Sequence, residues 1–293
     1  MIIEDLIKEE SKSVVLNLIN KNSDIDQFIK QTIIEKGELD DSDWEKIAYL
    51  TAIGDIRRKA KNIYKTKFKA EKIIEENKID IRNKPDSDLL NYYEDLVSNV
   101  SNEDMQEIWA RILVKEHMEH GSVTKAMLSA LSLLDRKTAL AFQKLCMYTF
   151  GLTVGDKIER FIPFVLYDDL CSQLIDYAED DSIRESIVSF SNDMPSQEEL
   201  IFLDEIGLIK LSDYNDESYV FTRECEEYVY QVGNQVWNEI PVFDEGQNNY
   251  FMGTGQAFFT HSGLVLFKAL NIQCCPEIAN IIRTYHKYGK ECW

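Results

Sequence analysis

The sequence lacks the features that mark membrane proteins, secreted proteins and zinc-binding modules. No apolar run approaches the roughly 20 residues that span a bilayer, and the N-terminus, MIIEDLIKEES, lacks the basic start and apolar core of a signal peptide. The six cysteines are scattered and include no Cys-x-x-Cys pair, as suits thiols in a reducing cytosol. We therefore expect a cytoplasmic protein with no membrane-spanning segment and no cofactor.

Positive charge is also scarce. The 32 Lys and Arg residues stand against 52 Asp and Glu, which gives a formal net charge of −20. Phosphate backbones and anionic membrane surfaces bind through a surplus of basic side chains. The composition therefore argues against general nucleic-acid or membrane binding, and it favours proteins, cations or small molecules as partners.

Helical spacing of apolar residues dominates the first half of the chain. It predicts helices over 3–20 and 24–36, then a helix of about 30 residues from Ser42 to Asn77, with Ser42 as its N-cap. Further helices are predicted over 86–100, 101–119, 122–134 and 135–150, with Ser122 and Asp135 as N-caps. Residues 1–150 are thus predicted to form an α-helical domain.

The pattern changes after Gly151. Strands are predicted soon after it and over 226–260, with helices over 168–179, 182–190, 262–270 and 276–289. Residues 195–222 are predicted to form a helix followed by a hairpin of LIKL and YVFT, an order similar to the end of a winged helix. The expected class is mainly α, with 151–293 as a smaller, winged-helix-like α+β domain.

The long helix is amphipathic in projection. One side collects Ile56, Ala60, Ile63, Ala70 and Ile74. The opposite side collects the five residues that we take as the candidate interaction surface, namely Arg58, Lys61, Lys65, Lys69 and Lys72. Residues 57–72 hold eight basic residues and one acid. A solvated face is the first interpretation. A contact for an acidic domain or another subunit is the second. Nucleic acid is the third, which the absence of interleaved aromatics opposes.

An acidic region balances the basic helix. Residues 193–245 contain 14 acids and two bases. Within the winged-helix-like unit, acids occupy both the helix (Glu198, Glu199, Asp204, Glu205) and the expected wing (Asp213, Asp216, Glu217). Because like charges repel, this face disfavours duplex binding. We expect it to be a structural or protein-binding element.

The segment SNEDMQEIWARILVKEH, residues 101–117, is strongly patterned. Its apolar residues recur at helical spacing, at Met105, Ile108, Trp109, Ile112 and Leu113. Ser101 and Asp104 are spaced as in a capping box. The segment offers no nucleophile–base pair, so we interpret it as a core helix.

Two histidines, His117 and His120, are the candidate metal ligands. They lie one helical turn apart, with Glu116 before His117 and Glu119 between the two histidines. This spacing allows both histidines to bind one metal ion, but it is not the His-Glu-x-x-His zinc pattern. A solvated helix end is the alternative interpretation. MGTGQAFFTHSG, residues 252–263, lacks the third glycine of a dinucleotide fingerprint, so it is interpreted as a turn.

A family resemblance follows from these segments. SNEDMQEIWARIL followed by GSVTKAMLSALSLLDRKTALAFQKL resembles the bacterial proteins grouped as domain of unknown function 2806, and RRKAKNIYK, FLDEIGLI and FTHSGLVLFKAL extend the similarity over about residues 40–270. HMEHGS replaces the Pro-Gly-Ser turn more usual there. The same helix pattern is similar to part of the abortive-infection alpha family. The resemblance implies a bacterial cytosolic protein in a defence or mobile-element setting. It supplies no catalytic residues that can be carried over to this sequence.

These features favour a non-enzymatic protein that acts through protein contacts or self-association, as an adaptor or sensor in phage defence. A nucleic-acid-associated regulator using residues 57–72 is the first alternative. A metal-dependent hydrolase centred on His117 and His120 is the second.

Overall fold

The computed structural model describes residues 23–81, 84–154, 158–165, 168–178, 180–211, 219–222, 228–232, 234–238, 249–252 and 257–288. The chain is mostly helical, with small antiparallel sheets in its second half, which confirms the predicted class. The helix predicted over 3–20 lies outside the described residues, as do Gly253 and Gly255 of the predicted turn.

The first half of the chain consists of helices close to the predicted ones. They are α2 (Ser23–Lys36), α3 (Asp41–Glu76), α4 (Ser87–Val97), α5 (Glu103–Met118), α6 (Lys125–Leu133) and α7 (Arg136–Met147). Helix α3 has 36 residues, so the long helix is confirmed. All five apolar residues predicted to form the inner face of α5 are buried.

The predicted N-caps are confirmed at one helix and displaced at others. Asp135 caps α7, with its carboxylate accepting a hydrogen bond from the Thr138 N–H at 2.8 Å. Elsewhere the observed caps are Asp40 instead of Ser42, Asn102 instead of Ser101, and Thr124 instead of Ser122. In each case the cap's side-chain oxygen accepts from the N–H three residues later. The cap is therefore the residue whose side chain can reach the N–H groups of the first turn, and residue type alone does not identify it.

The second half mixes strands and helices. The helices are α8 (Asp168–Tyr177), α9 (Asp181–Asp193), α10 (Gln197–Glu205), α11 (His261–Leu270) and α12 (Ile278–Tyr288). The strands are β1 (Thr149–Val154), β2 (Ile158–Pro163), β3 (Ile209–Leu211), β4 (Tyr219–Thr222), β5 (Tyr228–Val232), β6 (Gln235–Asn238), β7 (Asn249–Met252) and β8 (Ala257–Phe259). One antiparallel sheet has the order β2-β1-β5-β6, and the pairs β3-β8 and β4-β7 form two smaller sheets.

The prediction that the strands LIKL and YVFT, within residues 195–222, pair with each other as a hairpin is wrong. Strand β3 pairs with β8, so that Ile209 lies opposite Phe259, and β4 pairs with β7. Both partners follow residue 248, and a local pattern does not reveal pairing between segments so far apart in sequence. The expected wing residues Asp213, Asp216 and Glu217 lie outside the described residues.

Buried side chains form two large cores. The first joins α4 to α7 with α10, β3, β8 and α11, and the second joins β1, β2 and β5 with α8, α9 and α12. Helix α11 approaches β3 closely because Gly263 has no side chain: a Cβ there would lie 1.8 Å from the Leu208 carbonyl oxygen. Elements from both sides of residue 151 share the first core. The division of the chain into domains 1–150 and 151–293 therefore stays a prediction.

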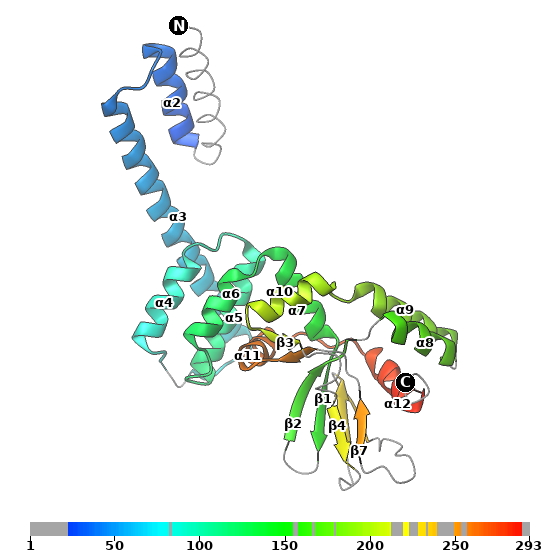
Figure 1. The fold of residues 1–293 in the computed structure, drawn as a ribbon. Helices are drawn as coiled ribbons and strands as arrows, with labels where there is room; N and C mark the ends of the chain where they lie inside the picture. The colour runs from blue at the N-terminus through cyan, green and yellow to red at the C-terminus, as the bar shows by residue number, and fades with distance from the viewer. Residues whose placement is uncertain are drawn as a thin grey trace, which may run out of the picture.

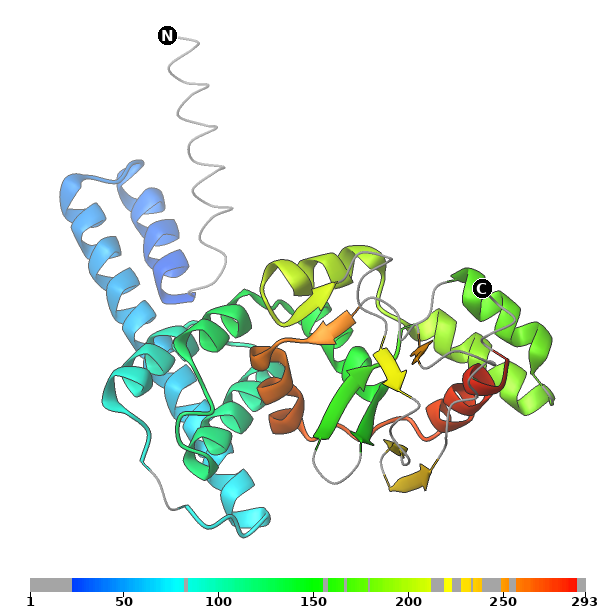
Figure 2. The ribbon, with the colours of Figure 1, turned by 60° about the horizontal axis from the view of Figure 1, so that its bottom comes forward.

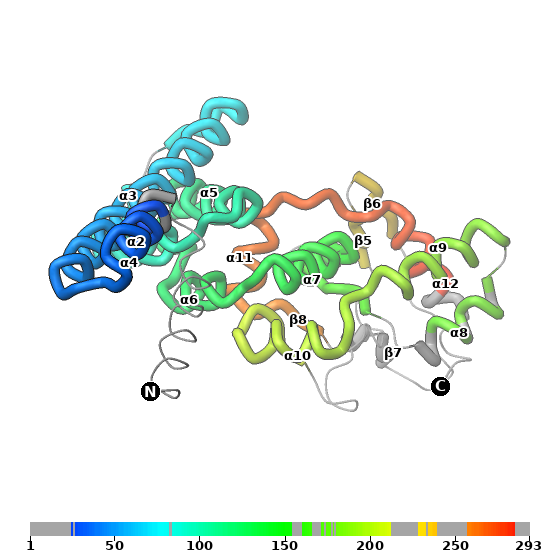
Figure 3. Tube along the Cα trace, turned by 90° about the horizontal axis from the view of Figure 1, so that it is seen from above, coloured from blue at the N-terminus to red at the C-terminus, as the bar shows by residue number. Residues whose placement is uncertain are grey.

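The described chain is elongated. Figures 1 and 2 show α2 and the first half of α3 standing away from the remaining helices. Figure 3, seen from above, shows the second half of α3 beside α5, and α8, α9 and α12 at the opposite end of the molecule. We call α2 and the first half of α3 the arm. The second half of α3 joins the arm to the other helices.

The fully buried Trp109 gives a test of the first core. Its ring meets Tyr93 edge to face with centroids 5.5 Å apart, and the Tyr93 hydroxyl donates to the Trp109 carbonyl at 2.8 Å. We expect Trp109→Ala to lower the free energy of unfolding by about 3–5 kcal/mol, measured by urea denaturation. Leu133→Ala is the control, because Leu133 is 59% exposed, and should change stability by less than about 0.5 kcal/mol. Equal stabilities for the two variants would contradict this assignment.

Candidate functional site

Helix α3 is covered on different sides along its length. Its first half packs against α2 through a small core in which Ile25, Ile29 and Ile47 are buried. Its second half packs against α4 and α5. The two halves therefore turn different faces inward, and the outer surface also changes direction along the helix.

The buried side of the second half is polar. Asn62, Thr66 and Ala70 are the residues buried there. The Asn62 amide donates to the Ser98 carbonyl at 2.8 Å and to the Ser101 hydroxyl at 3.2 Å. Because buried polar groups stabilise only when paired, these bonds fix how α3 lies against the α4–α5 connection.

The predicted apolar side of α3 is only partly buried. Ala70 is buried, and Ile63 and Ile74 pack partly against the first core. Ile56, by contrast, is 67% exposed, and Ala60 is exposed as well. A single projection treats the helix as having one inner face, whereas α2 covers its first half from one side and α4 and α5 cover its second half from another.

The five predicted basic residues lie within about 80° of one another on the helix, but they differ in their partners. Lys65 and Lys69 reach α5, with ammonium nitrogens 2.9 Å from Glu103 Oε1 and 3.8 Å from Glu107 Oε2. Arg58 pairs with Asp55 within α3. Lys61 and Lys72 remain exposed. A neighbouring cation, Lys67, pairs with Glu94 of α4.

Aromatic residues lie among the exposed cations, contrary to the expectation from sequence. Tyr64 is 68% exposed and Phe68 44% exposed, and their rings stack at 6.1 Å with an interplanar angle of 13°. The Lys72 ammonium lies 5.0 Å from the centre of the Phe68 ring. At about 100° per residue, Arg57, Lys61, Tyr64, Phe68 and Lys72 fall within about 80° of one another. We call these five residues the outer face.

An apolar strip continues from the outer face toward the arm. Tyr49 is 65% exposed, Ile56 and Ala60 are exposed, and Ile53 is half-buried. Their intervals of four, three and four residues place them in line on the helix surface. We call Tyr49, Ile53, Ile56 and Ala60 the seam. The seam and the outer face together make one exposed surface over residues 49–72.

The candidate metal ligands lie at the end of α5. His120 Nδ1 is 3.2 Å from Glu116 Oε1, and His117 is one turn before His120. Across the part of the chain that the structure describes, no group of three or more His, Cys, Asp or Glu side chains could hold a metal ion. The two histidines therefore have no further ligand there with which to complete a site.

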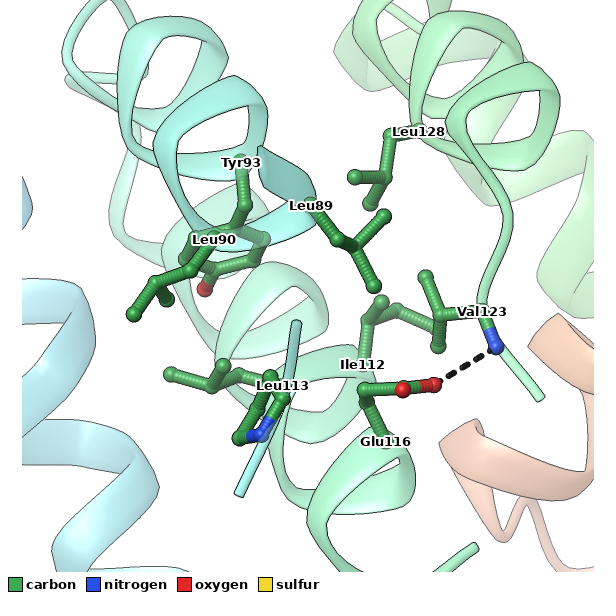
Figure 4. Close-up of a pocket in the computed structure, with 9 residues that line it drawn as sticks. Leu89, Leu90, Tyr93, Ile112, Leu113, Glu116, Val123 and Leu128 are labelled. Carbon is green, nitrogen blue, oxygen red and sulfur yellow. Dashed lines mark hydrogen bonds between the residues drawn. The ribbon is translucent and has the colours of Figure 1, made fainter. Parts of the chain in front are cut away.

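Glu116 has a structural role beside these histidines. Its carboxylate is buried and accepts hydrogen bonds from the Gly121 N–H at 2.8 Å and the Val123 N–H at 2.9 Å. Figure 4 shows it at the edge of an apolar pocket that also includes Tyr93 and Ile112. The cavity volume is about 10 Å³, close to what one water requires, so the pocket has no room for a substrate.

Two of the described cysteines, Cys146 and Cys275, are poor nucleophiles. Burial raises the pKa of the Cys146 thiol, and burial together with a hydrogen bond to Glu277 raises the pKa of the Cys275 thiol to about 11. The Cys275 sulfur lies 2.9 Å from Glu277 Oε2. Because the thiolate is the reactive form, both thiols are protonated and weakly nucleophilic near neutral pH.

A family comparison bears on this architecture. A model described as a protein of unknown function, DUF2806, matches residues 54–234, more than half of the 293 residues. The chain belongs to this family. No curated protein and no solved structure matches the chain.

The DUF2806 match covers only part of the exposed surface of α3. It begins at residue 54, so that α2, Tyr49 and Ile53 precede it while Ile56, Ala60 and the outer face lie within it. The family resemblance seen in the sequence is thereby confirmed, whereas the similarity to the abortive-infection alpha family stays a prediction. In this DUF2806 chain, no helix of the described segments is long and apolar enough to cross a membrane.

The hydrogen bonds of Glu116 give a second test of stability. Glu116→Ala leaves the buried Val123 N–H and the Gly121 N–H without their acceptor, and we expect a loss of about 3 kcal/mol in the free energy of unfolding. Glu119→Ala is the matched control, because Glu119 is exposed and pairs with Lys115 on the surface, so that its loss should cost less than about 1 kcal/mol. A Glu116 variant as stable as its control would show that the carboxylate is dispensable.

The raised pKa of Cys275 predicts a pH dependence. Alkylation of Cys275 by iodoacetamide, followed by peptide mass spectrometry, should be slow at pH 8 and accelerate toward pH 11 as thiolate forms. Glu277→Gln removes a nearby negative charge, which should lower the pKa and speed alkylation at pH 8. Buried Cys146 provides the internal control and should stay unmodified in the folded protein. Fast reaction of the unaltered Cys275 at pH 8 would contradict the prediction.

Proposed function

We propose that this protein is a non-enzymatic binding protein that acts through protein contacts made by the exposed surface of α3. The observation that carries the proposal is the continuous run of exposed apolar and aromatic side chains along residues 49–68. Contiguous apolar patches on soluble chains mark interaction sites more often than solvated faces do. Tyr49, Ile56, Tyr64 and Phe68 supply such a patch on one helix.

The outer face also suits a protein partner chemically. Aromatic and arginine side chains contribute most to binding energy at protein interfaces. Here Tyr64 and Phe68 stand beside Arg57, Lys61 and Lys72, which favours a partner surface that carries acids. Lys65 and Lys69 add less, because Glu103 and Glu107 already pair with them.

The biological setting belongs to the same proposal. We place the protein in the bacterial cytoplasm, as an adaptor or sensor in phage defence. The resemblance to the abortive-infection alpha family supports the defence setting, and the scattered thiols support the cytoplasmic location. We propose in addition that residues 1–150 and 151–293 act as two domains.

A nucleic-acid-associated regulator is the second candidate, and one observation favours it. Stacked, exposed aromatics between basic side chains are a surface on which single-stranded bases can stack, as Tyr64 and Phe68 could allow. The net charge of −20 opposes this reading, since most of the molecule repels phosphates. The metal-dependent hydrolase has no comparable support from the described residues.

Site-specific photo-crosslinking in living cells tests the proposal. Replacing Tyr64 with p-benzoylphenylalanine should yield covalent adducts with protein, because an interface would bury this position. Leu133 is the matched control, since it is 59% exposed but lies outside the surface of α3, and should yield few adducts. Absence of protein adducts at position 64 would contradict the proposal. Adducts with nucleic acid there, lost in the Lys61→Glu/Lys72→Glu variant, would favour the second candidate instead.

A further inference from the structure

We infer that the occupant of the seam is a second copy of this chain, which packs its α3 antiparallel to the first. This inference rests on the proposed function, because it names the partner of the same exposed surface. Three features carry it: the spacing of the seam, the small core of the arm, and the distribution of charge along α3.

The spacing of the seam suits helix pairing. Intervals of four, three and four residues are those of the a and d positions of a coiled coil. About a two-fold axis between Ile53 and Ile56, each Ile53 would lie opposite Ile56 of the other copy. Each Tyr49 would likewise lie opposite Ala60, so that a large side chain meets a small one and the seam is complementary to itself.

The arm has little core of its own. In the described part of the arm, the buried apolar cluster consists of Ile25, Ile29 and Ile47, while Tyr49 and Ile56 are more than half exposed. Two helices joined by so few contacts gain little stability alone, because helix stability comes mostly from burial of an amphipathic face. Two arms packed along the seam would bring four helices together and enlarge that core.

Charge decides between the two possible orientations. Residues 38–45, at the start of α3, contain five acids and no base, whereas 57–72 contain eight bases and one acid. Lys36 pairs with Asp40 and Asp43, and the other three acids, Glu38, Asp41 and Glu45, are exposed. Antiparallel packing places this acidic start beside the basic half of the other copy. Parallel packing would place like charges together.

The dimensions of α3 allow this arrangement. A helix of 36 residues is about 54 Å long, and the proposed axis lies within two residues of the midpoint between the acidic and the basic blocks. Since the arm projects from the other helices in Figures 1 and 2, a second arm can approach the seam. The helical cores of the two copies would then lie at opposite ends of the paired helices.

Sedimentation velocity of the full chain over a concentration series tests the inference. We expect a dimer, and we expect Ile53→Asp/Ile56→Asp to weaken it by at least 100-fold. Leu133→Asp, the control outside the seam, should leave the dimer unchanged. Circular dichroism of each variant confirms that it is folded.

Charge reversal tests the orientation independently of the apolar contact. Glu38→Lys/Asp41→Lys/Glu45→Lys should dimerise weakly, as should Arg57→Glu/Lys61→Glu/Lys72→Glu, while an equimolar mixture of the two should form mixed dimers. Asp40, Asp43, Lys65 and Lys69 are left unchanged because they hold the helix cap or the contact with α5. Full dimerisation of either variant alone would overturn the antiparallel arrangement.

The outcomes separate this inference from the proposed function. A monomer at about 100 times the cellular concentration, together with crosslinks from position 64 to a different protein, would overturn the second copy as partner and leave the proposed function standing. A monomer without any protein adduct would overturn both. Adducts of position 64 with its own chain would support both.

Discussion

Helix α5 is buried at nine of its 16 residues, so its neighbours must cover it on almost every side. Helices α3 and α11 pack against it, Tyr93 of α4 packs on Trp109, and residues of α6 share the same core. Asn62, Thr66 and Ala70 are the buried residues on the side of α3 that meets α5. What the second half of α3 presents to solvent is therefore determined by its packing against α5, and the outer face lies on the side that this packing leaves exposed.

The ion pairs between α3 and its neighbours add little energy but determine which cations remain outside. Exposed pairs such as Lys65–Glu103 contribute roughly 0–1 kcal/mol, so burial and the hydrogen bonds of Asn62 hold the two helices together. Each pair nevertheless holds one cation of α3 against a neighbouring helix. Arg57, Lys61 and Lys72 are left beside Tyr64 and Phe68, which concentrates charge and aromatic surface in one place.

Local patterns in the sequence were sufficient for the helices and insufficient for long-range pairing. The inner face of α5, from Met105 to Leu113, and the length of α3 could be predicted because both depend on spacing within one helix. The partners of β3 and β4 could not, since they come from residues after 248. Likewise, the exposure of Ile56 depends on where α2 stops covering α3, which one helical projection does not show.

The charge segregation of the chain bears on how the basic helix is neutralised. Three cations of α3 pair with Glu94, Glu103 and Glu107 of α4 and α5, while Arg58 and Lys59 pair with Asp55 of α3 itself. Figure 3 shows α8, α9 and α12 at the other end of the molecule, far from α3. Asp193, in the acidic region that begins there, pairs instead with Lys144 of α7. Among the described residues, the basic helix thus draws its counter-charges from itself and from the helices that it packs against. The cations of the outer face, which pair with no acid of the described segments, are positioned to attract acids from another molecule.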